Sequence, residues 1–164
     1  MNPLPLNAPE KVARHLDALF GPGVASALPA DMMFEFSRRT GRIKNFSIAG
    51  ALAGTLRTDG GIALTISGAQ CLLDRSDQFA QNCIVPVEEA VPFVSEGRSL
   101  FCRHVGHCGP NVKVGSDVAL THEARVIAVG VSLFSSDLMK QYSRGVAVKV
   151  RQGIKSRAEQ LENV

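Results

Sequence analysis

Short valine-rich runs broken by glycine fill the second half of this sequence and restrict it to a small β-rich fold. Residues 126–133 are a mostly apolar run interrupted by Gly130. Residues 146–150 read as a strand whose valines point inward and whose Lys149 points outward, because side chains alternate between the two faces. Five or six strands of this length with one helix fit a small, partly open barrel. Gly130 marks a tight bend of such a barrel.

The other segments of this half are equally short. Pro86 suggests that the strand at 84–87 lies at an edge or an end, and Gly97 ends a helix that begins at Glu88. The remaining predictions are a strand at 99–105, its pairing with 112–121 through a turn at 115–117, and a capped helical turn at 135–140.

The first half predicts a small α+β unit. Val12, Leu16, Leu19 and Phe20 share one face of a helix that Gly21 ends. Further predictions are strands at 32–36, 43–48 and 62–66, a short helix at 67–73, and a polar linker at 74–81. We therefore expect an α+β chain with a small α+β domain at 1–80, a second domain at 81–157 and a C-terminal tail at 158–164.

Composition limits the classes of function. The net charge is only +3, so a nucleic-acid site has to be a local basic patch. Trp is absent and Tyr142 is the single tyrosine, which argues against a platform of stacked rings for single strands. The sequence shows no signal peptide and no apolar run of roughly 20 residues, and its four cysteines form no dense framework. These features predict a cytoplasmic protein with reduced thiols and no membrane partner.

Two basic stretches contain no acidic residue. They cover residues 36–58 and 140–157. Their cations are Arg38, Arg39, Arg42, Lys44 and Arg57 in the first, and Lys140, Arg144, Lys149, Arg151, Lys155 and Arg157 in the second. Such runs can neutralise the phosphates of a nucleic acid. A solvated basic surface is the alternative.

The one metal-like constellation is Cys102, His104, His107 and Cys108. Two thiols and two imidazoles can complete a tetrahedral zinc site, but ligands usually come as pairs two to four residues apart on two separate turns. His107 and Cys108 are adjacent and would have to diverge. We therefore predict no metal and no cofactor. Cys102 beside His104 also lacks a third catalytic partner, so no catalytic residue is assigned.

The order of four sequence blocks resembles PUA domains, an RNA-binding fold. The blocks are EEAVPFVSEGRSLF at 88–101, VGSDV at 114–118, IAVG at 127–130 and RGVAVKVR at 144–151. The first half resembles the α+β domain that precedes PUA in archaeal tRNA-guanine (archaeosine) transglycosylases. That resemblance rests on SRRTGRIKN at 37–45, on Gly50, on TLRTDG at 55–60 and on LTISGA at 64–69.

The resemblance implies a PUA-type β pseudo-barrel that binds structured RNA such as tRNA. It places RNA contacts on the last strand and on the glycine-bearing loop, at Lys149, Arg151, Gly97 and Arg98. Arg144 extends this set, and Arg38, Arg39 and Arg42 are candidates in the first half.

Lys149 and Arg151 lie two residues apart on the predicted last strand. We expect their side chains to leave the same face about 7 Å apart, close to the spacing of successive phosphates.

Length decides the expected role. The family's catalytic (β/α) barrel needs about 250 residues, so the resemblance implies the RNA-binding part without the enzyme. Two alternatives stay open. The chain could be an accessory subunit of a separate tRNA-modifying enzyme, such as a split transglycosylase, or it could be a protein-interaction module.

Overall fold

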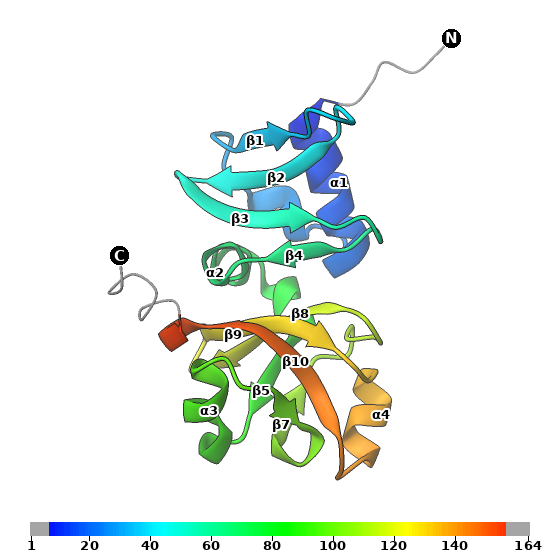
Figure 1. Cartoon of the computed structure of the whole chain (residues 1–164), viewed down its shortest axis with the longest axis vertical. Helices are drawn as coiled ribbons and strands as arrows, with labels where there is room; N and C mark the ends of the chain where they lie inside the picture. Colours follow the sequence, from blue (N-terminus) through cyan, green and yellow to red (C-terminus); the bar gives the residue numbers. More distant parts are fainter. Residues whose placement is uncertain (1–6, 157–164) are drawn as a thin grey trace.

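The computed structural model describes residues 7–156, which form two lobes stacked along the long axis (Figure 1). The first lobe holds a four-stranded antiparallel sheet in the order β1-β2-β3-β4. The second holds a six-stranded sheet in the order β6-β10-β9-β8-β5-β7. The α+β class is confirmed, while the predicted tail at 158–164 lies outside the described residues.

Local signals set the ends of the first helix. Helix α1 spans Ala8–Phe20, and the side chain of Asn7 accepts a hydrogen bond from the backbone N–H of Glu10. Gly21 follows the helix with a φ of 124°, a conformation that glycine adopts without penalty. The rest of the lobe is η1 (Val24–Ala27), β1 (Met33–Phe36), β2 (Ile43–Ile48), β3 (Ala51–Leu56), β4 (Ile62–Leu64) and α2 (Ile66–Arg75).

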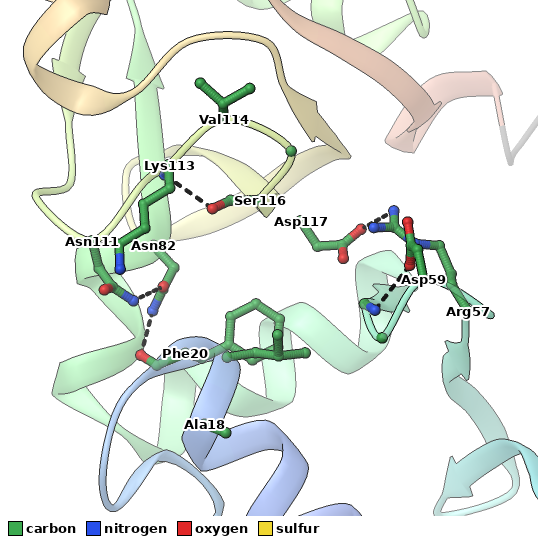
Figure 2. A pocket seen from close by; sticks show the side chains of 14 residues that line it. Ala18, Phe20, Arg57, Asp59, Asn82, Asn111, Lys113, Val114, Ser116 and Asp117 are labelled. Atoms are coloured by element: carbon green, nitrogen blue, oxygen red, sulfur yellow. Dashed lines mark hydrogen bonds and ion pairs between the residues drawn. The ribbon is translucent and has the colours of Figure 1, made fainter.

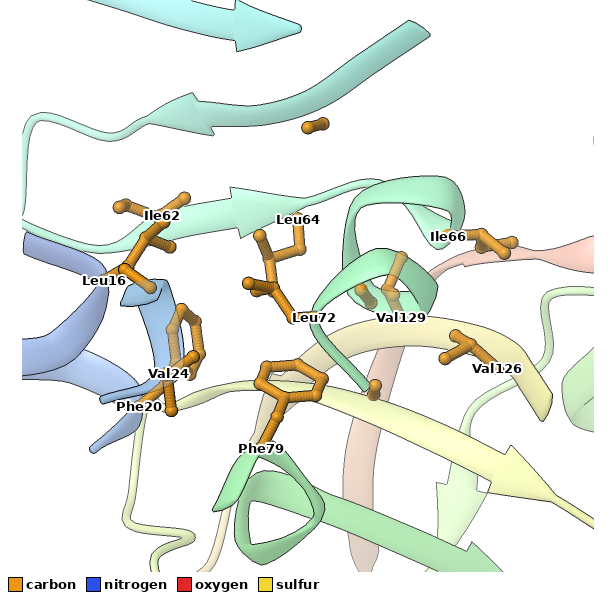
Figure 3. Packing of buried hydrophobic residues seen from close by; sticks show 14 of the residues in the cluster. Leu16, Phe20, Val24, Ile62, Leu64, Ile66, Leu72, Phe79, Val126 and Val129 are labelled. Carbon is orange, nitrogen blue, oxygen red and sulfur yellow. The ribbon is translucent and has the colours of Figure 1, made fainter. Parts of the chain in front are cut away.

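Helices α1 and α2 cover one face of this sheet. Leu16 from α1 and Leu72 from α2 are buried in one cluster with strand residues such as Ile62 (Figure 3). Val12 of α1 belongs to the same cluster. Gly68 is required for the approach of α2, because a Cβ there would lie 2.1 Å from the carbonyl oxygen of Ala53.

The segment predicted as a linker is instead packed into the core. Residues Asp77–Asn82 form the 3-10 helix η2, and Phe79 within it is fully buried. Its ring meets that of Phe20 edge to face at 5.5 Å. The prediction followed the polar residues around Phe79, but a single aromatic ring is enough to anchor a short segment when both lobes offer apolar surface.

The second lobe consists of short elements. They are β5 (Cys83–Pro86), η3 (Glu88–Ala90), α3 (Val91–Ser95), β6 (Leu100–Phe101), η4 (Cys102–His104), β7 (Val105–Cys108), β8 (Asp117–His122), β9 (Arg125–Ser132), α4 (Ser136–Gln141) and β10 (Val146–Gly153). Strands β6 and β7 occupy opposite ends of the strand order, yet only the three residues of η4 separate them in sequence. The sheet must therefore curl until its edges nearly meet, which gives the expected pseudo-barrel.

Two predictions for this lobe are wrong. The strand expected at 99–105 is broken by η4, where the chain turns the barrel corner and buries Cys102. Segment 112–121 does not pair with it. Strand β8 instead pairs with β9 in an antiparallel hairpin and with β5 in parallel. Barrel closure brings together strands that are not neighbours in sequence, and alternation of residue types carries no information on that choice.

Gly130 permits the close approach of the last two strands. A Cβ on Gly130 would lie 2.3 Å from the carbonyl oxygen of Lys149 on β10. Directly opposite, the register of β10 shifts between Val150 and Gln152, so Arg151 is the extra residue of a β-bulge. Among residues 7–156, no helix has the length and apolar character needed to cross a membrane.

Candidate nucleic-acid interface

The last strand exposes Lys149 and directs the partly exposed side chain of Arg151 toward the first lobe. Lys149 is exposed, while its neighbour Val148 is fully buried and pairs with Leu100 of β6. Arg151 lies in the bulge, and its guanidinium donates to the carbonyl oxygen of Leu64 in the first lobe. The expectation of two parallel side chains on one face is therefore wrong, because the bulge interrupts the two-residue alternation.

Arg151 is part of an ion-pair group between the lobes. The Asp117 carboxylate lies 2.9 Å from Nη1 of Arg57 and 3.8 Å from Nη1 of Arg151. Arg57 also pairs with Asp59 at 3.1 Å (Figure 2). The Asp117 side chain is only 5% exposed, and burial raises its pKa to about 6 although both guanidinium groups favour the charged form.

A cavity of about 390 Å³ opens beside this group, where the lobes meet. Asn82 and Asn111 join across its wall, since the Asn111 amide donates to Asn82 at 2.5 Å and Asn82 donates to the carbonyl of Phe20 at 2.7 Å (Figure 2). These bonds and the arginine contacts fix the two lobes against each other.

The glycine-bearing loop lies beside the end of β10, as the sequence predicts. Gly97 has a φ of 96° and ends α3, with its N–H donating to the carbonyl of Val94. A Cβ on Gly153 of β10 would lie 2.5 Å from the backbone nitrogen of Gly97. Arg98 then folds over the ring of Phe93 at 5.6 Å.

A second arginine–phenylalanine pair lies next to the first. The guanidinium of Arg103 lies 5.9 Å from the ring centroid of Phe101. Both phenylalanines are about half exposed, at 50% for Phe93 and 45% for Phe101. The two pairs line a shared groove of about 170 Å³ between α3 and β6. Nothing in the sequence pointed to this groove, because low aromatic content does not reveal which three of the eight phenylalanines, Phe36, Phe93 and Phe101, stay exposed.

A backbone hydrogen bond next to Arg144 holds this residue close to the segment that carries Phe101 and Arg103. It is exposed, and the carbonyl of the next residue, Gly145, accepts a hydrogen bond from the N–H of Cys102. We call this surface the β10 face and define it by Phe93, Arg98, Phe101, Arg103, Arg144 and Lys149. Within residues 7–156, none of its four cations forms an ion pair with a carboxylate.

The basic residues of the first lobe form a separate group. Arg38, Arg39 and Arg42 are exposed on the turn between β1 and β2. That turn is closed by the N–H of Ser37 donating to the carbonyl of Arg42 at 2.8 Å, with Gly41 at a φ of 69°. The structure therefore distributes the predicted RNA residues over two surfaces on different lobes (Figure 1).

The cysteines and histidines do not converge. Cys102 and Cys108 are buried in the apolar core of the second lobe, whereas His107 is exposed. Burial raises the pKa of both thiols. Across the described range 7–156, no group of three or more His, Cys, Asp or Glu side chains could hold a metal ion.

Comparisons with known proteins assign both lobes. Residues 84–154 match the PUA domain, and residues 10–78 match the patch-forming domain C2 of tRNA-guanine transglycosylase. The tRNA-guanine(15) transglycosylase of Methanobrevibacter smithii is 29% identical over 149 residues, which cover 89% of this chain and 22% of the relative. That of Methanothermobacter thermautotrophicus is 31% identical over 147 residues, covering 88% and 22%. The chain thus spans less than a quarter of the length of these relatives.

Solved structures share the whole two-lobed fold. A hypothetical protein from Pyrococcus horikoshii OT3 superposes with a TM-score of 0.69 at 21% identity, covering 93% of both chains. A PUA domain from Aeropyrum pernix K1 superposes with a TM-score of 0.65 at 17% identity, covering 96% of this chain and 89% of the other. The resemblance stated from the sequence is confirmed: the chain is a PUA-domain protein that corresponds to the C-terminal region of archaeal tRNA-guanine(15) transglycosylases.

Proposed function

We propose that this protein binds structured RNA of the tRNA class through the β10 face and catalyses no reaction itself. The observation that carries the proposal is a PUA domain on which two arginines without carboxylate partners lie over two half-exposed phenylalanines that line one groove. The exposed cations Arg144 and Lys149 belong to the same domain. Lysine and arginine neutralise backbone phosphates, which supplies affinity without sequence specificity. An exposed ring next to them offers a face on which an unpaired base can stack.

The shape of RNA fits such a surface. An A-form helix presents phosphates and 2′-hydroxyls on a broad, shallow groove, and proteins recognise it largely by shape. Gly97 brings backbone close to the β10 face without a side chain in the way. The choice of tRNA rests on the relatives, whose names describe transglycosylases acting on tRNA. We place the protein in the cytoplasm, where such RNA is met.

The proposal that the chain catalyses no reaction rests on how little of each relative it matches. The alignments extend over 22% of each of these relatives and over the two C-terminal domains matched here. The same coverage favours one second candidate, an accessory subunit that supplies RNA binding to a separate tRNA-modifying enzyme. The two differ in one measurement, since a subunit raises the rate of its enzyme on tRNA and an independent binder does not.

The test is binding of labelled total tRNA at several salt concentrations. Lys149→Ala/Arg144→Ala removes two cations of the β10 face and should leave folding intact, since exposed charges contribute within about 0.5 kcal/mol. It should weaken binding to all tRNAs alike and lower the slope of log affinity against log salt by roughly two, because each phosphate contact contributes about 0.9.

The matched control is Arg14→Ala/Arg125→Ala, which removes the same charge from two exposed positions outside the β10 face. It should keep the wild-type salt slope. A wild-type chain that binds no tRNA, or that binds an acidic protein without competition from tRNA, would contradict the proposal and favour the protein-interaction module.

A further inference from the structure

A basic groove in the first lobe brings together residues that are far apart in the sequence. It has a volume of about 810 Å³ and lies between α1, the β1–β2 turn and the β3–β4 turn. Helix α1 contributes Lys11 and His15, and the β1–β2 turn contributes Arg39 and Arg42. No acidic residue of the described chain lines this groove.

The cations of this groove differ in how far they are neutralised. Arg57 pairs with Asp59 and Asp117, and Lys44 lies 3.6 Å from Glu35. Within residues 7–156, Lys11, Arg39 and Arg42 have no carboxylate partner. Three positive charges thus face one concave site that supplies no countercharge of its own. A solvated basic surface would spread its cations over a convex face, so the concavity favours an anionic ligand.

The groove is also held in shape before any ligand arrives. The Nε2–H of His15 donates to the carbonyl of Gly60 at 2.6 Å, which joins α1 to the β3–β4 turn. The N–H of Gly41 donates to the carbonyl of Ser37 at 2.8 Å, which closes the arginine turn. A rigid site loses less conformational entropy on binding.

An aromatic ring completes the lining. Phe36, at the end of β1, is 51% exposed and lines the groove together with the arginines. A ring at this exposure next to guanidinium groups suits a ligand that has both negative charges and flat apolar faces. A nucleotide strand has both, whereas inorganic anions lack the faces and acidic peptides rarely supply them.

We propose that this groove is a second RNA site, which binds the sugar–phosphate backbone of an unpaired segment and stacks one base on Phe36. The inference rests on the proposed function in that the ligand is the same RNA. The β10 face and the groove lie on different lobes, and the buried contacts of Asp117 and Asn82 join those lobes. One RNA molecule would then contact both domains of the chain.

The experiment compares three variants of the full chain for binding of labelled tRNA and of a short poly-uridine strand. Arg39→Ala/Arg42→Ala empties the groove of two exposed cations. We expect tRNA affinity to fall on the order of tenfold and the salt slope to fall by roughly two. Phe36→Leu keeps an apolar side chain but removes the ring, and should weaken the poly-uridine strand about fivefold or more.

The β10-face variant Lys149→Ala/Arg144→Ala separates the two proposals, with Arg14→Ala/Arg125→Ala as the charge control. If the wild-type chain binds tRNA and the β10-face variant is impaired while both groove variants match the control, the groove inference is overturned and the proposed function stands. If the groove variants are impaired and the β10-face variant is not, the groove is the RNA site and the proposed function is wrong about its location. If the wild-type chain binds no RNA, both fail.

Discussion

At the scale of single residues, Asp117 is where burial and charge oppose each other most strongly. Its carboxylate is almost inaccessible, but two arginines from different parts of the chain reach it. Burying a carboxylate costs free energy, and nearby cations offset only part of that cost. Burial has the larger effect, because the neutral carboxyl is easier to bury than the carboxylate, and it raises the pKa of Asp117 to about 6.

Titration of Asp117 should make the free energy of unfolding depend on pH. An unfolded aspartate has a pKa of about 3.9. Between that value and about 6, the folded chain holds a proton on Asp117 that the unfolded chain has lost. The contribution of Asp117 to the free energy of unfolding should therefore fall as the pH rises through this window, by up to about 3 kcal/mol.

Asp117→Asn removes this titration while keeping the shape of the side chain. We expect the difference in unfolding free energy, variant minus wild type, to rise between about pH 4 and pH 6 and to be constant above it. Urea unfolding across this pH range measures the difference. A difference that does not change with pH would mean that Asp117 stays ionised in the folded protein.

At the scale of elements, the turn of the β8–β9 hairpin holds two residues in a backbone conformation that their residue types disfavour. His122 pairs with Arg125, so Glu123 and Ala124 alone make the turn. Their φ values are 50° and 62°, in the left-handed region that suits the twist of a two-residue hairpin. For residues other than glycine, this conformation costs roughly 1–2 kcal/mol each.

Ala124→Gly should therefore stabilise the protein by about 0.5–1 kcal/mol, because relief of the left-handed conformation exceeds the extra flexibility of glycine in the unfolded chain. Thermal unfolding measures the gain. The reverse change at the β2–β3 turn, Gly50→Ala, is the matched control. Gly50 has a φ of 80° and free space around it, so alanine there should be destabilising by about 1 kcal/mol for conformational reasons alone. Equal effects of the same sign would refute the explanation.

At the scale of the whole molecule, one apolar core runs through the junction of the two lobes. Leu72 and Phe79 pack in the same cluster as Val126 and Val129 of strand β9 (Figure 3). The lobes therefore share buried surface that neither would keep by itself.

This shared core predicts that the two lobes unfold in one transition. Urea curves followed by Tyr142 fluorescence, which reports on the second lobe, should coincide with curves followed by far-ultraviolet circular dichroism. Phe79→Ala, which leaves a cavity at the junction, should lower the free energy of unfolding by about 3–5 kcal/mol while keeping the transition single. Two separated transitions in the wild-type protein would show that the lobes are independent.

Features that depend on near neighbours in the chain could be predicted from the amino-acid sequence. The glycine after α1, the inward Val148 and outward Lys149, and the stop at Gly97 all follow from residues within one turn or one strand. The order of the four PUA blocks also determined the fold of the second lobe. Such signals are local, because backbone conformation and side-chain alternation are set over a few residues.

Features that depend on distant partners became visible only in the folded chain. Closure of the barrel split the strand predicted at 99–105, and the bulge in β10 placed the guanidinium of Arg151 against Leu64 and Asp117. Packing between the lobes buried Phe79, and folding of three separate segments placed Lys11 and Arg42 in one groove. The physical reason is common to all four. Each outcome depends on which surfaces meet across the molecule, and that choice minimises the exposed apolar area and unpaired polar groups of the whole chain.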